Sequence, residues 1–198
     1  MFIELTDQLR CPAHHAESFL VLVPDVMEGR RVQRGILGCP VCHAEYRIDE
    51  GVVDFGGTGP PGRRAVEPSS QPDAGALLAF LAIEGPGGYV GLIGEAARQV
   101  GGLAELLPGV HFALVNPPVD TVASAASSAL RAMRAPFKVR SLRGVVLGQP
   151  ESRDAQWQAE AVGAVLPGLR AVGEGPLPAL EGFELLGAAG GWWVGRSV

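Results

Sequence analysis

The chain has 198 residues, of which 47% are hydrophobic, and it carries a formal net charge of −5. This composition can bury a sizeable core, which excludes intrinsic disorder over most of the length. The negative net charge excludes electrostatic binding of nucleic acid by the molecule as a whole. No hydrophobic run reaches the roughly 18 residues that a membrane span needs. The N-terminus lacks the basic region of a secretory signal, so we expect a cytoplasmic protein.

Cysteine and histidine are concentrated near the N-terminus, in two short segments of related form. Residues 11–14 read CPAH and residues 39–42 read CPVC. Two ligands separated by two residues can chelate one ion from a tight turn, and two such turns complete the closed tetrahedron of a structural zinc site. The sequence therefore predicts a structural Zn²⁺ held by Cys11, His14, Cys39 and Cys42.

The histidine ligand and the role of the cysteines have alternatives. His15 directly follows His14, but His14 has the knuckle spacing and is preferred. A redox C-x-x-C pair would need a thioredoxin-like βαβ pattern, which does not surround Cys39 and Cys42. A reduced, buried cysteine pair without metal is the simplest alternative. Three cysteines and one histidine leave no open coordination position, so we expect no catalysis at the metal.

A segment rich in Gly, Pro and Ser, residues 57–72, predicts a linker between two units. The first unit, residues 1–56, is too small to be comfortably stable through its core alone, which fits the need for a metal. The second unit spans residues 73–198.

Helices and strands alternate in the second unit. This alternation predicts an α/β fold with a mostly parallel sheet and an antiparallel hairpin at one edge. Asp73 is the expected N-cap of the first helix. One of Trp192 and Trp193 is expected in the core and the other at the surface. The expected helices are 74–83, 95–107 and 154–166, the last ended by Pro167-Gly168; the expected strands are 89–93, 111–115, 142–147, 169–172, 183–186 and 192–194, and 123–133 is ambiguous.

The residues around the two CP segments resemble a known family. Residues 5–12 (LTDQLRCP) and 46–55 (YRIDEGVVDF) are similar to the small zinc-ribbon family of the tRNA methyltransferase activator subunit. The resemblance covers residues 1–56 and implies a β-rich zinc ribbon. The chain departs from the family at His14, where Cys is usual, and at residues 53–54, where Pro is usual.

The second unit resembles a Rossmann-like S-adenosylmethionine methyltransferase. The similarity lies in residues 135–137 (APF), 141–147 (SLRGVVL) and 165–172 (VLPGLRAV). It implies a cofactor turn after the first strand, at residues 92–98 (LIGEAAR), and an acidic residue after the second strand.

The turn departs from that family where the cofactor would bind. Gly94 matches the first glycine, but Ala96 and Arg98 stand where further glycines are usual, and Asn116 replaces the acid. A crowded turn and a neutral acceptor both weaken binding of the cofactor. We therefore expect a vestigial site at Gly94, Glu95 and Asn116, no appreciable S-adenosylmethionine binding and no catalytic residue.

Three functions remain open, and whether the chain is an enzyme is uncertain. The preferred hypothesis is a non-catalytic protein that binds another protein, such as a methyltransferase, or a second copy of itself. One alternative is an S-adenosylmethionine-dependent methyltransferase acting on RNA or protein. The other is a zinc-ribbon RNA-binding module that uses the basic stretch 131–143. We expect that stretch to bind nucleic acid weakly at most, because the overall charge is negative.

Overall fold

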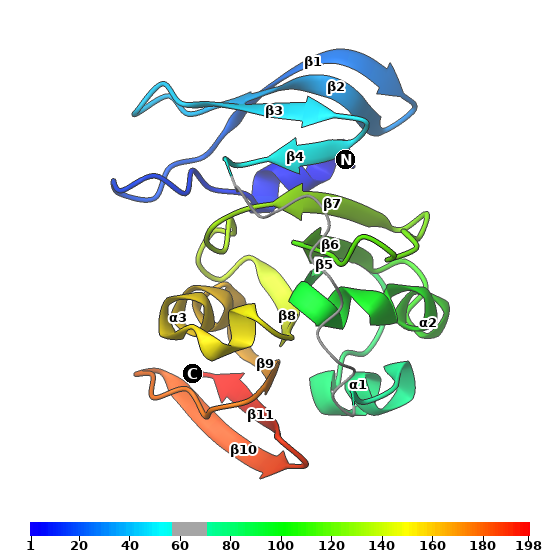
Figure 1. The fold of residues 1–198 in the computed structure, drawn as a ribbon, viewed down its shortest axis with the longest axis vertical. Coiled ribbons are helices and arrows are strands. Elements are labelled where there is room, and N and C mark those ends of the chain that lie inside the picture. The colour runs from blue at the N-terminus through cyan, green and yellow to red at the C-terminus, as the bar shows by residue number, and fades with distance from the viewer. Residues whose placement is uncertain (57–70) are drawn as a thin grey trace.

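A computed structural model describes residues 1–56 and 71–198, so most of the predicted linker lies outside the described residues. Eleven strands form one sheet in the order β1-β2-β3-β4-β7-β6-β5-β8-β9-β11-β10 (Figure 1). The strands are β1 (Val21–Glu28), β2 (Arg31–Gly38), β3 (Glu45–Asp49), β4 (Val52–Asp54), β5 (Tyr89–Ile93), β6 (His111–Val115), β7 (Ser127–Arg131), β8 (Leu142–Leu147), β9 (Val165–Glu174), β10 (Phe183–Ala189) and β11 (Trp192–Ser197). The helices are α1 (Ala74–Leu81), α2 (Val100–Leu106) and α3 (Ala155–Gly163), with 3₁₀ turns η1 (Ile3–Gln8), η2 (Gly94–Gln99) and η3 (Glu151–Arg153).

The two predicted units share this sheet. Strands β1 to β4 pair antiparallel with one another, and β4 then pairs parallel with β7, where Val53 lies opposite Leu130. A second link is an isolated bridge that joins Leu9 to Phe137. The N-terminal unit is therefore built onto the edge of the second unit.

The central strands confirm the predicted α/β architecture. Strands β7, β6, β5, β8 and β9 are parallel, and β11 and β10 add an antiparallel hairpin at the far edge. The ambiguous segment 123–133 contains a strand, β7. The chain winds outward from β5 in one direction through β6 and β7, and in the other through β8 and β9. The switch point of this doubly wound sheet thus lies between β5 and β8, where open α/β sheets bind their ligands.

Helices cover both faces of the central sheet (Figure 1). Along β5, Val90 and Leu92 point into the cluster formed with α1 and α2, whereas Tyr89 and Ile93 point into the cluster formed with α3 and η1. Asp73 caps α1 as predicted, because its carboxylate accepts a hydrogen bond from the amide of Ala76 at 2.8 Å. The described connections 116–126 and 132–141 contain no helix, and η1 packs on the second of them.

The structure departs from the predicted elements in two places near the C-terminus. Pro167 and Gly168 do not end a helix; they lie inside β9, where a register shift against β8 accommodates them. Trp192 and Trp193 are both buried, because β11 lies between β9 and β10 and has a core cluster on each face.

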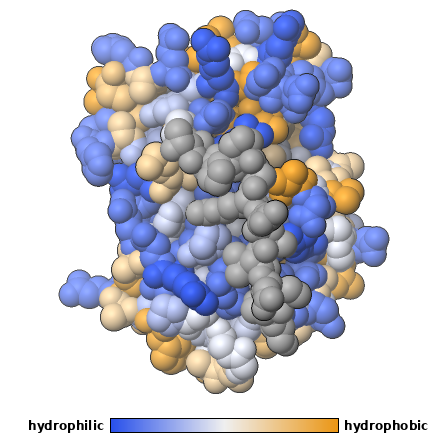
Figure 2. Space-filling model, in the orientation of Figure 1, coloured by the Kyte–Doolittle hydropathy of each residue, from blue (hydrophilic) through white to orange (hydrophobic). Residues whose placement is uncertain are grey.

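On the face shown in Figure 2, hydrophobic and hydrophilic residues are intermixed. Exposed hydrophobic residues occur on the two edge strands, among them Val21 and Val23 on β1 and Leu185 and Leu186 on β10. No helix in the described part of the chain is long and apolar enough to cross a membrane.

Candidate metal centre and cofactor crevice

Two loops bring the cysteines together. The first connects η1 to β1 and is closed by a hydrogen bond from the Cys11 amide to the Ser18 carbonyl, at 3.1 Å. The second is the tight turn between β2 and β3. There the Cys39 amide donates to Ala44 at 2.9 Å, and the His43 amide donates back to the Cys39 carbonyl at 3.0 Å.

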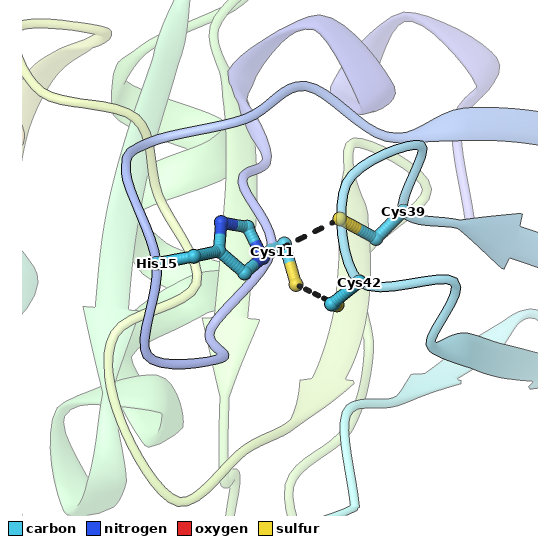
Figure 3. Close-up of side chains that lie close together, drawn as sticks. All are labelled: Cys11, His15, Cys39 and Cys42. Carbon is cyan, nitrogen blue, oxygen red and sulfur yellow. Dashed lines mark hydrogen bonds between the residues drawn. The ribbon is translucent and has the colours of Figure 1, made fainter.

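Four side chains converge between these loops: Cys11, His15, Cys39 and Cys42 (Figure 3). Their ligand atoms all lie within 4.8 Å of one another. The sulfurs of Cys11 and Cys42 are 3.6 Å apart, and Cys39 Sγ lies 3.5 Å from His15 Nε2. A tetrahedron with Zn–S bonds of about 2.3 Å and a Zn–N bond of about 2.0 Å has S–S edges of about 3.8 Å and S–N edges of about 3.5 Å. The cluster could therefore hold a metal ion of that kind.

The histidine in the cluster is His15, whereas the sequence favoured His14. His14 is exposed and lies outside the group, while His15 is half-buried. In the first loop the His15 amide donates to the Ala13 carbonyl at 2.9 Å, and His15 is the histidine whose ring lies with the three cysteines.

The electrostatics of the cluster favour a thiolate at Cys39. Burial raises the pKa of that thiol, but hydrogen bonds from the amides of Cys42 and Val41 outweigh it and lower the pKa to about 6. Burial raises the pKa of Cys11. The Tyr46 hydroxyl lies 3.1 Å from Cys11 Sγ, and burial, followed by this contact, raises the pKa of Tyr46. Tyr46 therefore stays protonated and can donate a hydrogen bond to the Cys11 sulfur, as groups around metal ligands commonly do.

The second candidate site is the crevice at the switch point, and the protein's own main chain bridges it. The Gly148 amide donates to the Ile93 carbonyl at 3.0 Å, and the Glu95 amide donates to the Gln149 carbonyl at 2.9 Å. Gly94 has a φ of +63° and packs so closely that an added Cβ would overlap the Gln149 carbonyl oxygen. The turn after β5 thus lies directly against the turn after β8.

Asn116 is also engaged within the protein. Its Oδ1 accepts from the Ala132 amide at 2.9 Å, and its Nδ2 donates to the Ala132 carbonyl at 2.8 Å and to Glu151 Oε1 at 3.0 Å. The Asn116 amide group therefore joins the end of β6 to the end of β7 and to η3. Sequence reasoning missed the contribution of Gln149 and Glu151, although their position directly after the fourth central strand could have indicated it.

Arg98 does not crowd the crevice in the way that we expected. Its guanidinium pairs with Glu95 at 2.6 Å and with Asp120 at 2.5 Å, and these hydrogen bonds raise the pKa of Arg98. The 148–151 segment fills the space instead. Ala96 does face this segment, because a Cβ on Gly148 would lie against the Ala96 amide nitrogen.

Several cations of the basic stretch 131–143 form ion pairs or hydrogen bonds within the protein. Arg134 forms an ion pair with Glu160, and Arg143 donates to the carbonyls of residues 84–87. Lys138 Nζ likewise donates to the Asp7 carbonyl at 2.9 Å. In residues 1–56 and 71–198, Arg131 and Arg140 are the cations of the stretch whose side chains have neither an ion pair nor a hydrogen bond.

No protein-family model matches the sequence, and no curated protein matches it. Similar solved structures include phosphoethanolamine N-methyltransferase 2 of Haemonchus contortus in complex with S-adenosyl-L-methionine, at 14% identity and a TM-score of 0.39 over 55% of this chain and 30% of that one. They also include the antibiotic-resistance methyltransferase Kmr, at 15% identity and a TM-score of 0.42 over 67% of this chain and 96% of that one. This chain thus spans less than a third of the length of the first structure. Both likenesses are too low to indicate a function, and the α/β architecture is established by the strand order alone.

Proposed function

We propose that this protein is a zinc-stabilised, non-catalytic protein with a methyltransferase-like sheet, and that it acts by binding another protein. The observation that carries the non-catalytic part is the bridged switch point. The main chain of residues 93–95 bonds directly to residues 148–149, where a doubly wound fold would admit its ligand.

The metal in this proposal is zinc, bound by Cys11, His15, Cys39 and Cys42, and residues 1–56 act as a zinc ribbon. The support is the match between the separations of 3.6 Å (Cys11 Sγ to Cys42 Sγ) and 3.5 Å (Cys39 Sγ to His15 Nε2) and the edges of a zinc tetrahedron. Three thiolates and a histidine saturate the ion, which gives it a structural role. It ties the loop before β1 to the turn between β2 and β3.

S-adenosylmethionine does not fit the residues at the switch point. The cofactor would need the space that Gln149 and Glu151 occupy beside Gly94, and it would need an acceptor for its ribose hydroxyls. The Asn116 side chain is instead held by hydrogen bonds to Ala132 and Glu151. We therefore assign no methyl-transfer step to this chain.

The partner that we propose is a protein. The zinc-ribbon resemblance favours a methyltransferase that this chain would assist, with a second copy of this chain as the alternative. An RNA-binding role is less well supported, because Arg134 and Arg143 of the basic stretch are engaged within the protein.

Metal analysis and calorimetry together test the proposal. We expect one zinc per chain in the purified protein and no saturable heat on titration with S-adenosylmethionine. Replacing Cys39 by Ser should remove the metal, whereas replacing the exposed His43 should not. A protein that folds normally without metal would contradict the zinc assignment. A micromolar dissociation constant for S-adenosylmethionine would contradict the non-catalytic assignment.

A further inference from the structure

An open groove of about 510 Å³ lies beside the filled crevice. One wall is formed by η2 and α2 and includes Arg98 and Glu105. The other wall is formed by residues 120–124, in the connection from β6 to β7. This connection leaves the sheet at the edge where the strands of a doubly wound fold present their binding residues.

The charges in the groove are unbalanced. Arg98 is paired with both Glu95 and Asp120, so its single positive charge is shared by two carboxylates. Glu105, on the same wall, is exposed and has no ion pair among the residues that the structure describes. The groove therefore favours a cationic group, in keeping with the negative charge of the whole chain.

Two exposed valines lie in, or directly before, the lining segment 120–124. Val122, which lines the groove, is 84% exposed, and Val119, one residue before the lining segment, is 70% exposed. Exposed hydrophobic side chains grouped beside unpaired acid are typical of an interaction surface and not of a site for a bare cation.

Each wall also contains a polar atom that lacks a partner in the described structure. Nη2 of Arg98 needs an acceptor, and Oγ1 of Thr121 has no hydrogen bond. Both atoms are buried, so the 120–124 segment must shift slightly before a ligand can reach them. A peptide main chain offers a carbonyl acceptor and an amide donor in alternation, so a peptide inserted between the walls could satisfy both.

We infer that this groove binds an extended, basic segment of a partner protein. Its Lys or Arg side chain lies between Glu105 and Asp120, and its apolar neighbours cover Val119 and Val122. This inference rests on the proposed protein-binding function and specifies the chemistry of the partner.

The test uses the full-length zinc-loaded protein and three probes: a fluorescein-labelled octapeptide of alanine, valine and arginine, its twin with glutamate in place of arginine, and free arginine amide. We expect saturable anisotropy with the basic peptide only. Glu105→Lys should weaken it about tenfold, whereas Glu181→Lys, which makes the same charge change at an exposed position outside the groove, should not. Amide NMR shifts should map to residues 98–105 and 119–124.

Three results would overturn the inference: no binding of the basic peptide, equal binding of the acidic twin, or binding of arginine amide as tight as that of the peptide. The last result would indicate a small-molecule cation site. Failure here leaves the zinc content and the calorimetry with S-adenosylmethionine unaffected, so it is distinguishable from failure of the proposed function.

Discussion

The Tyr46 hydroxyl lies 3.1 Å from Cys11 Sγ, so a residue of β3 contacts a metal-ligand candidate from the N-terminal loop. Tyr46 also packs against Phe55, with ring centroids 4.9 Å apart. The ring therefore packs in the core, whereas the hydroxyl contacts the Cys11 sulfur. These two roles can be separated by removing the oxygen alone.

We expect Tyr46→Phe to lower zinc affinity by about 10-fold to 100-fold, which is typical for the loss of a hydrogen bond to a metal ligand. The ring packing should survive. Competition with a chromophoric chelator measures the affinity. Tyr89→Phe is the control, since Tyr89 is buried outside the cluster. Equal affinity of Tyr46→Phe and the unchanged protein would show that the contact does not stabilise the thiolate.

The choice between the two adjacent histidines can be tested directly. Replacing His15 by Ala removes one of the four ligands and should reduce zinc content and thermal stability together. Replacing His14 by Ala changes an exposed side chain outside the cluster and should leave both unchanged. Metal analysis of the two variants, purified side by side, gives the answer. Zinc loss in the His14 variant alone would restore the assignment that the sequence favoured.

Cys39 should titrate near pH 6 in metal-free protein, because the amides of Cys42 and Val41 lower its pKa to about 6 against the effect of burial. The thiolate form is then present at neutral pH and is lost on acidification through pH 6. Ultraviolet absorbance of the thiolate, followed as pH rises, should show this step. Cys39→Ser should lack it, with circular dichroism confirming that the variant is folded. A first step only above pH 8 would contradict the prediction.

Asn116 should be important for stability and not for cofactor binding. Its φ of +50° suits Asn better than Ala, and its side chain makes hydrogen bonds to Ala132 and Glu151. We expect Asn116→Ala to cost roughly 2–4 kcal/mol, from lost hydrogen bonds and backbone strain. Asn116→Gly removes the bonds without the strain, so its smaller loss in a denaturation experiment separates the two causes. Losses below about 0.5 kcal/mol in both variants would mean that the bonds contribute little.

The central strands could be predicted from sequence because each is a short apolar run between turn residues. Strands 89–93, 111–115 and 142–147 have the predicted bounds. The continuity of the sheet could not be predicted, since the pairing of β4 with β7 joins residues far apart in the chain and depends on tertiary packing. The three cysteines of the cluster followed from spacing, whereas the choice of His15 depends on a local turn that spacing does not determine. The hydrogen bonds that close the switch point depend on the path of residues 148–151. Those residues contain no motif from which that path could be predicted.

Removal of the metal should loosen one end of the sheet before the other. Cys11, Cys39 and Cys42 connect the loop before β1 to the turn between β2 and β3, and binding of a structural zinc contributes folding free energy directly. A chelator should therefore increase amide hydrogen exchange in β1, β2 and β3. Strands β5 and β8 lie at the centre of the sheet, with buried side chains on both faces, and should keep their protection.

Strand β4 determines how far the loss of protection extends, because it pairs with β3 on one side and with β7 on the other. Its pairing with β7 covers two residue positions, so we expect β4 to exchange with the N-terminal strands. Unfolding of the whole chain in one step would instead show that the eleven strands form a single cooperative unit. Unchanged exchange in β1 to β3 after complete metal removal would show that the metal does not hold them.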